Sequence, residues 1–373
     1  MMKVVPFFDY QAIYTRFESE FDAAFKDVCS RGAFILQKDL LDFERSLAGF
    51  LNVKHALGVA DGTNAMIIGF KALGIGHGDE VIISSHTYVA TAAAIHMVGA
   101  SPVFADIDEN NMLSAVAAEK KITGKTKAIM PTQVNGRCAD MTAIQEVAAR
   151  HGLYVLEDSA QGLGAKFKGQ SAGTFGRFGT LSFYPAKLIG CFGDGGAVMT
   201  NDSAMAEKLS LWRDHGRNEQ GEVVAWGTNA RLDNLQAAFL QIRLDHYDED
   251  IMRRREIARR YENAFRGHNK LYPPQGPDAD PDYFDVYQNY EMAAEDRDKL
   301  RKSLADKGIK TVVQWAGTPV HHFSGLGFGK EKFEDLSRTN WFFERCLLLP
   351  MHMAMSYEDV DYVIENVLNF YKV

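Results

Sequence analysis

The chain has 373 residues, of which 46% are hydrophobic and 24% charged, a composition typical of a globular protein with a sizeable core. Its 41 basic and 49 acidic side chains give a formal net charge of −8. That balance argues against a protein whose main task is to bind nucleic acid or an anionic membrane, because either partner needs a basic face. No apolar run approaches the roughly 20 residues of a membrane-spanning helix, and the N-terminus lacks the apolar core of a signal peptide.

Four cysteines are scattered along the chain, at Cys29, Cys138, Cys191 and Cys346, without a CxxC spacing. The sequence therefore predicts neither a zinc site nor any other metal site. Scattered single cysteines fit a reducing compartment, so we expect a cytoplasmic protein in which these side chains are small buried residues.

Short apolar runs rich in β-branched residues alternate with helical patterns between residues 50 and 205. This alternation is typical of a mostly parallel sheet that is covered by helices on both faces. Glycines 74, 99 and 152 stand where helices are expected to end, and Asp140 stands where one is expected to begin. The predicted strands are 55–61, 80–85, 101–107, 128–134, 153–159, 180–185 and 196–201, and the helices between them are 62–74, 87–99 and 140–152.

The composition changes at residues 272–285, which are rich in Pro, Gly and Asp and predict a loop. Before it, helix 253–265 is basic and amphipathic, and the acidic chain favours a solvated helix face over a nucleic-acid contact. We expect a large domain at 1–249, including the N-terminal segment, and a smaller α+β domain at 250–373. The other elements predicted in this half are helices 203–215, 230–247, 297–308 and 357–371 and strands 287–292 and 309–315.

A large α/β sheet does not itself define a function, so the side chains near predicted strand ends carry the argument. Asp158 closes the strand-like run LYVLED, and Lys187 follows in the mostly apolar run LSFYPAKLIG. An aspartate at the C-terminal end of a parallel strand lies in the crevice where α/β proteins bind ligands. Apolar surroundings depress the pKa of a lysine, which makes its amine a better nucleophile.

This pair of residues fits pyridoxal 5′-phosphate, which needs a lysine for a Schiff base and a carboxylate beside its ring nitrogen. The phosphate of that cofactor suits backbone N–H groups at a helix N-terminus. The turn Gly62-Thr63-Asn64 supplies such groups, Ser182 is placed to add a hydroxyl, and Tyr88 is placed to stack on the ring.

The sequence resembles the DegT/DnrJ/EryC1/StrS aminotransferases, the nucleotide-sugar branch of the fold-type I pyridoxal phosphate enzymes. The resemblance is most specific where EDSAQ (157–161), SFYPAK (182–187) and GDGG (193–196) follow in order. It implies an α/β fold with a large domain built on a mostly parallel seven-stranded sheet and a smaller C-terminal α+β domain. Further similar segments are 31–66, 78–108, 227–238 and 347–360.

The resemblance also implies a role for each matching position. Lys187 matches the Schiff-base lysine, which also shuttles a proton, and Asp158 matches the partner of the pyridine nitrogen. Asn229 matches an asparagine that reaches the phosphate from the partner subunit, which implies a homodimer with shared active sites. Gly62, Thr63, Asn64 and Ser182 match the phosphate site, Gln161 the residue beside the ring hydroxyl, Tyr88 the stacking aromatic, and Arg231 and His321 segments that usually face the substrate.

The implied activity is transfer of an amino group from L-glutamate to a keto-sugar, foremost a nucleotide-linked keto-deoxyhexose. Such a step belongs to amino-sugar biosynthesis, for a lipopolysaccharide O-antigen, another surface polysaccharide or a glycosylated natural product. Two alternatives stay open: a dehydratase-like relative, although such relatives carry histidine in place of Lys187, and a catalytically silent scaffold. The segment PTQVNGR (131–137) departs from the usual HxYG-like stretch, and loop 321–333 also differs, so the sugar, its nucleotide and the aminated carbon stay undefined.

Overall fold

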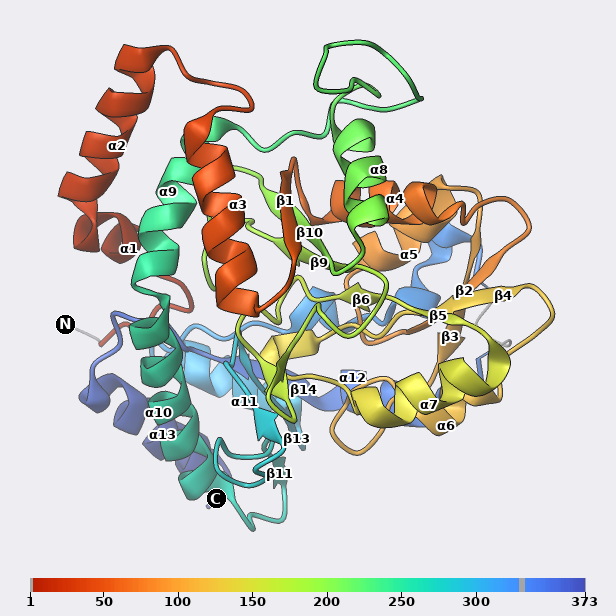
Figure 1. Ribbon diagram of the computed structural model, residues 1–373. Coiled ribbons are helices and arrows are strands. Elements are labelled where there is room, and N and C mark those ends of the chain that lie inside the picture. The colour runs from red at the N-terminus through yellow and green to blue at the C-terminus, as the bar shows by residue number, and fades with distance from the viewer. Residues whose placement is uncertain (1–2, 329–332, 373) are drawn as a thin grey trace.

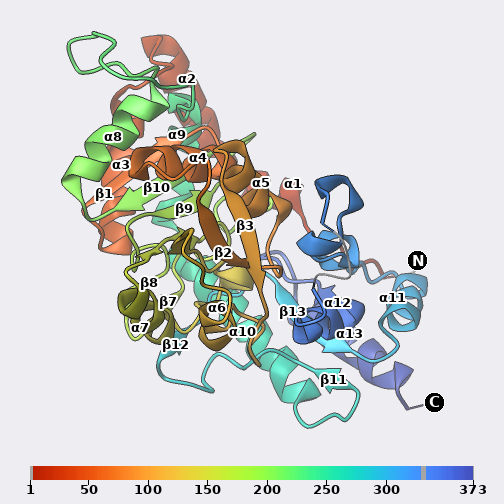
Figure 2. The same ribbon diagram turned by 90° about the vertical axis from the view of Figure 1, so that its right-hand side faces the viewer.

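The computed structural model describes residues 3–328 and 333–372 (Figures 1 and 2). A large sheet with helices on both faces forms one unit, and a smaller sheet with its own helices lies beside it. Both marked chain ends lie near helices of the smaller unit. Among the described residues, no helix combines the length and the apolar character needed to cross a membrane.

The large sheet is built from two four-stranded halves that share one interrupted strand. That strand breaks at Leu156, whose N–H still donates to the Ile129 carbonyl at 3.0 Å, so the halves join into seven strands within the described chain. Its strand pairs are parallel except at β10, which is antiparallel to both neighbours. The mostly parallel sheet expected from the sequence is therefore confirmed. In spatial order the strands are β3 (Ser101–Ala105), β2 (Glu80–Ser84), β4 (Thr126–Ile129), β5 (Tyr154–Val155) with β6 (Glu157–Asp158), β9 (Gly179–Ser182), β10 (Gly196–Thr200) and β1 (His55–Val59).

Each face of this sheet buries its own hydrophobic cluster beneath amphipathic helices. Three predicted helix ends are confirmed: the Asp140 side chain accepts from the Ala143 N–H, and Gly74 and Gly152 end their helices in the left-handed region. Helix α5 (Val89–Met97), by contrast, has its C-cap at Val98 rather than at Gly99. One face carries α3 (Lys38–Leu51), α6 (Ala115–Glu119), α7 (Met141–His151) and α9 (Asn234–Asp245), and the other carries α4 (Gly62–Leu73), α5 (Val89–Met97) and α8 (Ser203–Arg213).

The C-terminal unit has a three-stranded antiparallel sheet and a core that also includes Val5. Val5 pairs with Ile309, so the start of the chain packs into this unit. A boundary after residue 249 falls within one helix, α10, and stays a prediction. The elements are α10 (Tyr247–Phe265), β11 (Leu271–Tyr272), β13 (Tyr290–Ala294), α11 (Arg297–Asp306), α12 (Ser337–Arg345), β14 (Cys346–Leu349) and α13 (Tyr357–Phe370).

Three expectations for local structure are wrong. Residues 309–315 form two isolated bridges, Ile309 with Val5 and Val312 with Leu348, rather than a continuous strand. The expected loop 272–285 contains a short strand that pairs with a hairpin of the large unit, and Cys29 is exposed rather than buried. The remaining elements are α1 (Tyr10–Arg16), α2 (Glu18–Arg31), β7 (Lys166–Phe167), β8 (Gln170–Ser171), β12 (Tyr283–Phe284) and the 3-10 turns η1 (Val134–Gly136), η2 (Gln314–Gly317), η3 (Val320–His322) and η4 (Ser324–Leu326).

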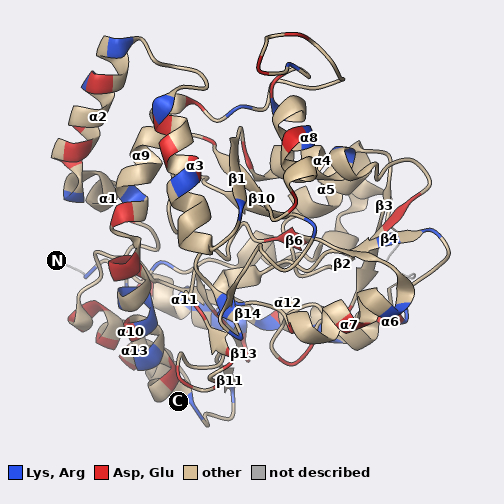
Figure 3. Ribbon diagram, in the orientation of Figure 1, with Lys and Arg blue, Asp and Glu red and all other residues tan. Residues whose placement is uncertain are grey.

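The basic helix α10 is only partly a solvated face. Its positive and negative side chains are interspersed (Figure 3), but Arg254 and Arg255 are buried. Arg255 donates to the carbonyls of Asp285 and Pro277, each at 2.8 Å. These guanidinium groups therefore join α10 to the segment before β13 rather than facing solvent.

Candidate active site

Lys187 lies on the loop that connects β9 to β10. Its backbone N–H donates to the Tyr184 carbonyl at 2.8 Å, which makes a tight turn. Burial lowers the pKa of the amine to about 8, and the negative charge of Asp158 opposes part of that shift. About one Lys187 amine in ten is then neutral at pH 7, against fewer than about one in a thousand for an ordinary lysine. The loop thus presents a lysine that can act as a nucleophile.

Asp158 is held at the end of β6 in a single orientation. It is 4% exposed, and its Oδ2 atom accepts a hydrogen bond from Thr91 Oγ1 at 2.6 Å. Its Oδ1 atom accepts from the Ala160 N–H at 3.1 Å. Thr91 in turn bonds to Thr87 at 2.6 Å, and Thr87 accepts from Thr132 at 2.8 Å. This chain of hydroxyl groups orients the carboxylate at the edge of the sheet.

The turn that begins α4 meets the ends of two strands. A Cβ atom on Gly62 would lie 3.1 Å from Ser182 Cβ, so the two predicted phosphate-binding residues are neighbours. A Cβ atom on Gly196 would come within 2.5 Å of the Asp61 carbonyl carbon, so this approach requires glycine. The structure therefore brings the helix N-terminus and the Ser182 hydroxyl together.

Asp61 caps α4 and also binds the Asn64 side chain. Its carboxylate accepts from the Asn64 backbone N–H at 2.8 Å and from the Asn64 side-chain amide at 2.6 Å. The first N–H groups of a helix have no partner within the helix. The backbone N–H groups of Gly62 and Thr63 therefore remain to meet an anion, whereas that of Asn64 is already bound.

Gln161 is tied to the segment that departs from the family pattern. Its Oε1 atom accepts from the Asn135 backbone N–H at 2.7 Å, which leaves the Gln161 amide hydrogens available as donors. The Asn135 side chain donates to Glu291 Oε2 at 2.5 Å and accepts from Asn289 at 2.9 Å. Residues 131–137 are thus bound to the C-terminal unit, and nothing in the sequence pattern signalled that contact.

A cavity of about 40 Å³ lies beside this contact, lined in part by His86, Asn111, Asn135, Arg137, Asp285 and Glu291. Within the described residues, Glu291 Oε1 and Asp285 Oδ1 are buried without a hydrogen-bond partner. No group of three or more His, Cys, Asp or Glu side chains that could hold a metal ion occurs in residues 3–328 and 333–372.

The other predicted site residues differ in how the single chain places them. Tyr88 is 56% exposed, and its ring centroid lies 6.4 Å from that of Trp315. His321 is buried, contacts Ser85 Oγ at 2.7 Å, and has a pKa lowered to about 4 by burial, so it is neutral at pH 7. Arg231 pairs with Asp214 at 2.9 Å. Part of the predicted acceptor loop 321–333, residues 329–332, lies outside the described residues.

Asn229 is exposed and follows a protruding segment. Residues 216–228 extend beyond α8 at the top of Figure 1, and Trp226 in this segment is 88% exposed. Nearby, Arg231 pairs with Val59 at the edge of the large sheet, and Asp233 pairs with Ile35.

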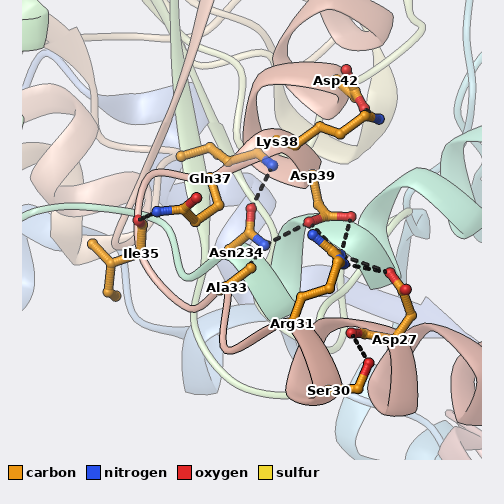
Figure 4. Close-up of polar contacts among 11 residues, drawn as sticks. Asp27, Ser30, Arg31, Ala33, Ile35, Gln37, Lys38, Asp39, Asp42 and Asn234 are labelled. Carbon is orange, nitrogen blue, oxygen red and sulfur yellow. Dashed lines mark hydrogen bonds and ion pairs between the residues drawn. The ribbon is translucent and has the colours of Figure 1, made fainter.

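A polar network fixes the chain just after this segment, at the start of α9 (Figure 4). The buried Asn234 accepts from the Leu40 N–H at 2.8 Å and donates to the Ala33 carbonyl and to Asp39, each at 2.7 Å. Arg31 completes the network by donating to Asp39 at 2.9 Å. The start of α9 is therefore joined to residues 31–40, while residues 219–226 are exposed.

Comparison with known proteins decides the family. The model of the DegT/DnrJ/EryC1/StrS aminotransferase family matches residues 15–368. The chain belongs to this family. Its members are pyridoxal phosphate-dependent aminotransferases, which confirms the fold class and the enzyme class expected from the sequence.

Several relatives cover nearly the whole chain. It is 39% identical over 349 residues to the dTDP-3-amino-3,4,6-trideoxy-alpha-D-glucose transaminase of Streptomyces venezuelae, covering 93% of this chain and 91% of that protein. It is 36% identical over 369 residues to the UDP-2-acetamido-2-deoxy-3-oxo-D-glucuronate aminotransferase of Pseudomonas aeruginosa, covering 98% and 100%. The crystal structure of S. venezuelae DesV in complex with a ketimine intermediate is similar with a TM-score of 0.95 and 37% identity, covering 99% of each chain.

Proposed function

We propose that this family member transfers an amino group from L-glutamate to a nucleotide-linked keto-sugar. The observation that carries the proposal is the amine of Lys187, whose pKa is lowered to about 8 by burial even though the charge of Asp158 opposes that shift. The relatives named for dTDP- and UDP-linked sugars support a nucleotide-sugar substrate. The product would enter amino-sugar biosynthesis, such as that of an O-antigen or a glycosylated natural product.

The described residues fit pyridoxal phosphate, and its attachment by a Schiff base to Lys187 is part of the proposal. When bound, the cofactor supplies an aldehyde for the amine and a protonated ring that takes up electrons. Gly62, Thr63 and Asn64, with the adjacent Ser182 hydroxyl, would bind the phosphate at the α4 N-terminus. The other contacts we propose are Asp158 on the ring nitrogen, Gln161 on the ring oxygen and Tyr88 on the ring face.

Lys187 would act twice in each half-reaction. It would hold the cofactor at rest, and its released neutral amine would then accept a proton from the donor α-carbon and pass it on to the cofactor side. The same amine moves a proton in the opposite direction when the sugar receives nitrogen. Asp158 keeps the ring nitrogen protonated throughout because its carboxylate is fixed by Thr91 and Ala160. A lysine at 187, rather than a histidine, favours amino transfer over dehydration.

We also propose a homodimer in the cytoplasm, with each site completed by Asn229 of the second copy. Asn229 and the protruding Trp226 are exposed in the single chain, which is what a residue reserved for a partner requires. Arg231 and His321 are proposed to support the substrate side of the site from their buried or half-buried positions. The free, scattered cysteines fit a reducing compartment.

The proposal is tested by adding L-glutamate to the cofactor-loaded protein and following its visible absorbance. We expect the band to bleach, and borohydride reduction before glutamate addition to leave the cofactor on Lys187 in a mass spectrum. Lys187→Ala should lose both signals, while Lys208→Ala, at an exposed lysine on α8, should keep them.

Two outcomes would contradict the proposal. A protein that never takes up the cofactor would support the scaffold alternative. A Lys187→Ala variant with full turnover would contradict the assignment of this lysine as the residue that binds the cofactor and moves the proton. If neither outcome occurs, reverse reactions with dTDP- and UDP-linked amino-sugars will identify the nucleotide and the aminated carbon.

A further inference from the structure

One side chain of the C-terminal unit binds the peptide groups on both sides of Lys187. Gln288 Nε2 donates to the Ala186 carbonyl at 2.8 Å, and Gln288 Oε1 accepts from the Leu188 N–H at 2.8 Å. Gln288 is 3% exposed and lies two residues before β13. A single amide that holds the carbonyl before a residue and the N–H after it restricts the backbone angles of that residue.

Gln288 is itself held firmly. Arg254 of α10 is buried, and its Nη1 atom donates to the carbonyls of Tyr287 and Gln288, each at 3.1 Å. The nearby Val286 N–H donates to the Gly136 carbonyl at 2.9 Å. The segment that carries Gln288 is therefore anchored to a helix of its own unit and to the large unit.

The loop that carries Lys187 depends on such outside support because it lies between two strands without regular structure of its own. Arg243 Nη2 adds one bond, to the Leu188 carbonyl at 3.1 Å. Within the loop, Gly190 packs so tightly on Pro185 that a Cβ atom would lie 2.4 Å from the Pro185 carbonyl oxygen. These contacts hold the loop as a whole, whereas the Gln288 amide acts at Lys187.

We propose that Gln288 is a positioning residue that aims the Lys187 amine at the cofactor and couples it to the C-terminal unit. The inference rests on the proposed cofactor attachment at Lys187. Reacting groups that are misplaced by about 1 Å lose as much as about a hundredfold in rate, so two hydrogen bonds beside the lysine have a measurable effect. The same bonds keep the amine buried, which is the cause of its lowered pKa.

The test uses protein freed of cofactor and then mixed with pyridoxal phosphate. Gln288→Met keeps the length of the side chain but removes both hydrogen bonds. Gln314→Met is the matched control, because Gln314 is also 3% exposed and neither of its amide atoms has a partner in the described part of the chain. The readouts are the rate at which visible absorbance appears across a pH series, and the cofactor found on Lys187 after borohydride reduction.

We expect Gln288→Met to react about tenfold more slowly at neutral pH. Its pH midpoint should move upward from about 8, because a loosened lysine regains solvent. Gln314→Met should match the wild type. Gln288→Asn keeps a polar amide but is too short to bind both peptide groups, so it should show the same slower reaction.

The proposal is overturned if both Gln288 variants fold and react with the wild-type rate and pH midpoint. It is also overturned if both fail to fold while Gln314→Met folds, since Gln288 would then serve stability. Failure of the wild type to form an adduct on Lys187 would instead refute the proposed function.

Discussion

The loop around Lys187 and the segment 216–228 differ in how far the rest of the chain holds them in place. The Lys187 loop is irregular, yet it is held by hydrogen bonds from Gln288 and Arg243 of the same chain. The chain just after segment 216–228 is fixed at Asn234, but the segment itself carries the 88% exposed Trp226. In the proposed dimer, one half of the candidate site is completed within a single chain, and the other half by the second copy.

This contrast separates two kinds of variant. Changes at Asp158, Lys187 or Glu291 act inside one chain, so mixing with another variant should not repair the altered site. In the proposed dimer, changes at Asn229 act on the neighbouring subunit, so a partner that carries an intact Asn229 should repair them. The following experiments test the two halves in order of decreasing effect.

The largest effect is expected at the half that one chain builds alone. Asp158→Ala removes the charge proposed to face the ring nitrogen, and turnover should fall by about 10²–10³-fold. Thr91→Val is the matched variant, because it removes one hydrogen bond to Asp158 and leaves the charge, so its loss should be much smaller. Steady-state rates with glutamate measure both. Equal losses in the two variants would contradict the role given to the Asp158 charge.

The half that needs a partner is tested by complementation. Lys187→Ala and Asn229→Ala should each be inactive, and unfolding and refolding them together should restore about a quarter of wild-type sites, because each mixed dimer has one intact site. Turnover per subunit measures the recovery. A mixture that stays inactive, while size measurements show mixed dimers, would place Asn229 outside the site.

The pH dependence of cofactor uptake tests the lowered pKa of Lys187, which belongs to the half of the site that one chain builds. The pKa of Lys187 is lowered to about 8, so the neutral, reactive amine is scarce below that pH and dominant above it. The rate of adduct formation should rise about tenfold per pH unit below the midpoint and level off above it. A rate that continues to rise to pH 10 would indicate that the amine is not buried as described.

The smallest effect is expected at the hydrogen bonds that link Glu291 through Asn135 to Gln161. Glu291→Leu removes the acceptor for Asn135, and the pH midpoint of the visible band should rise by about one unit because the ring oxygen loses a donated hydrogen bond. Glu291→Gln keeps an acceptor and should stay near the wild type. Tyr290→Phe, on the same strand at a hydroxyl without a partner in the described residues, is the control. If the visible band titrated at the same pH in all three variants, the proposed link from Glu291 to Gln161 would be contradicted.

Much of this protein was predictable from local pattern. Periodic apolar residues and caps such as Asp140 located most strands and helices of the large sheet, because these signals act over a few neighbouring residues. Asp158 and Lys187 could be identified from the EDSAQ and SFYPAK motifs, which the family resemblance covers. The strand expected at 309–315 is replaced by two isolated bridges, to Val5 and to Leu348, and β-branched residues alone do not reveal which partners such a segment meets.

The sequence by itself determined the order of elements, the family and the two groups most directly tied to the chemistry. Only the tertiary structure showed that Gln288 binds the backbone beside Lys187, that Asn135 contacts Glu291, and that Arg254 is buried. These contacts join residues about a hundred or more positions apart, and such pairs leave no periodic trace in a single sequence. Whether an arginine faces water or a buried carbonyl depends on which element packs against it, and packing is decided by the fold as a whole.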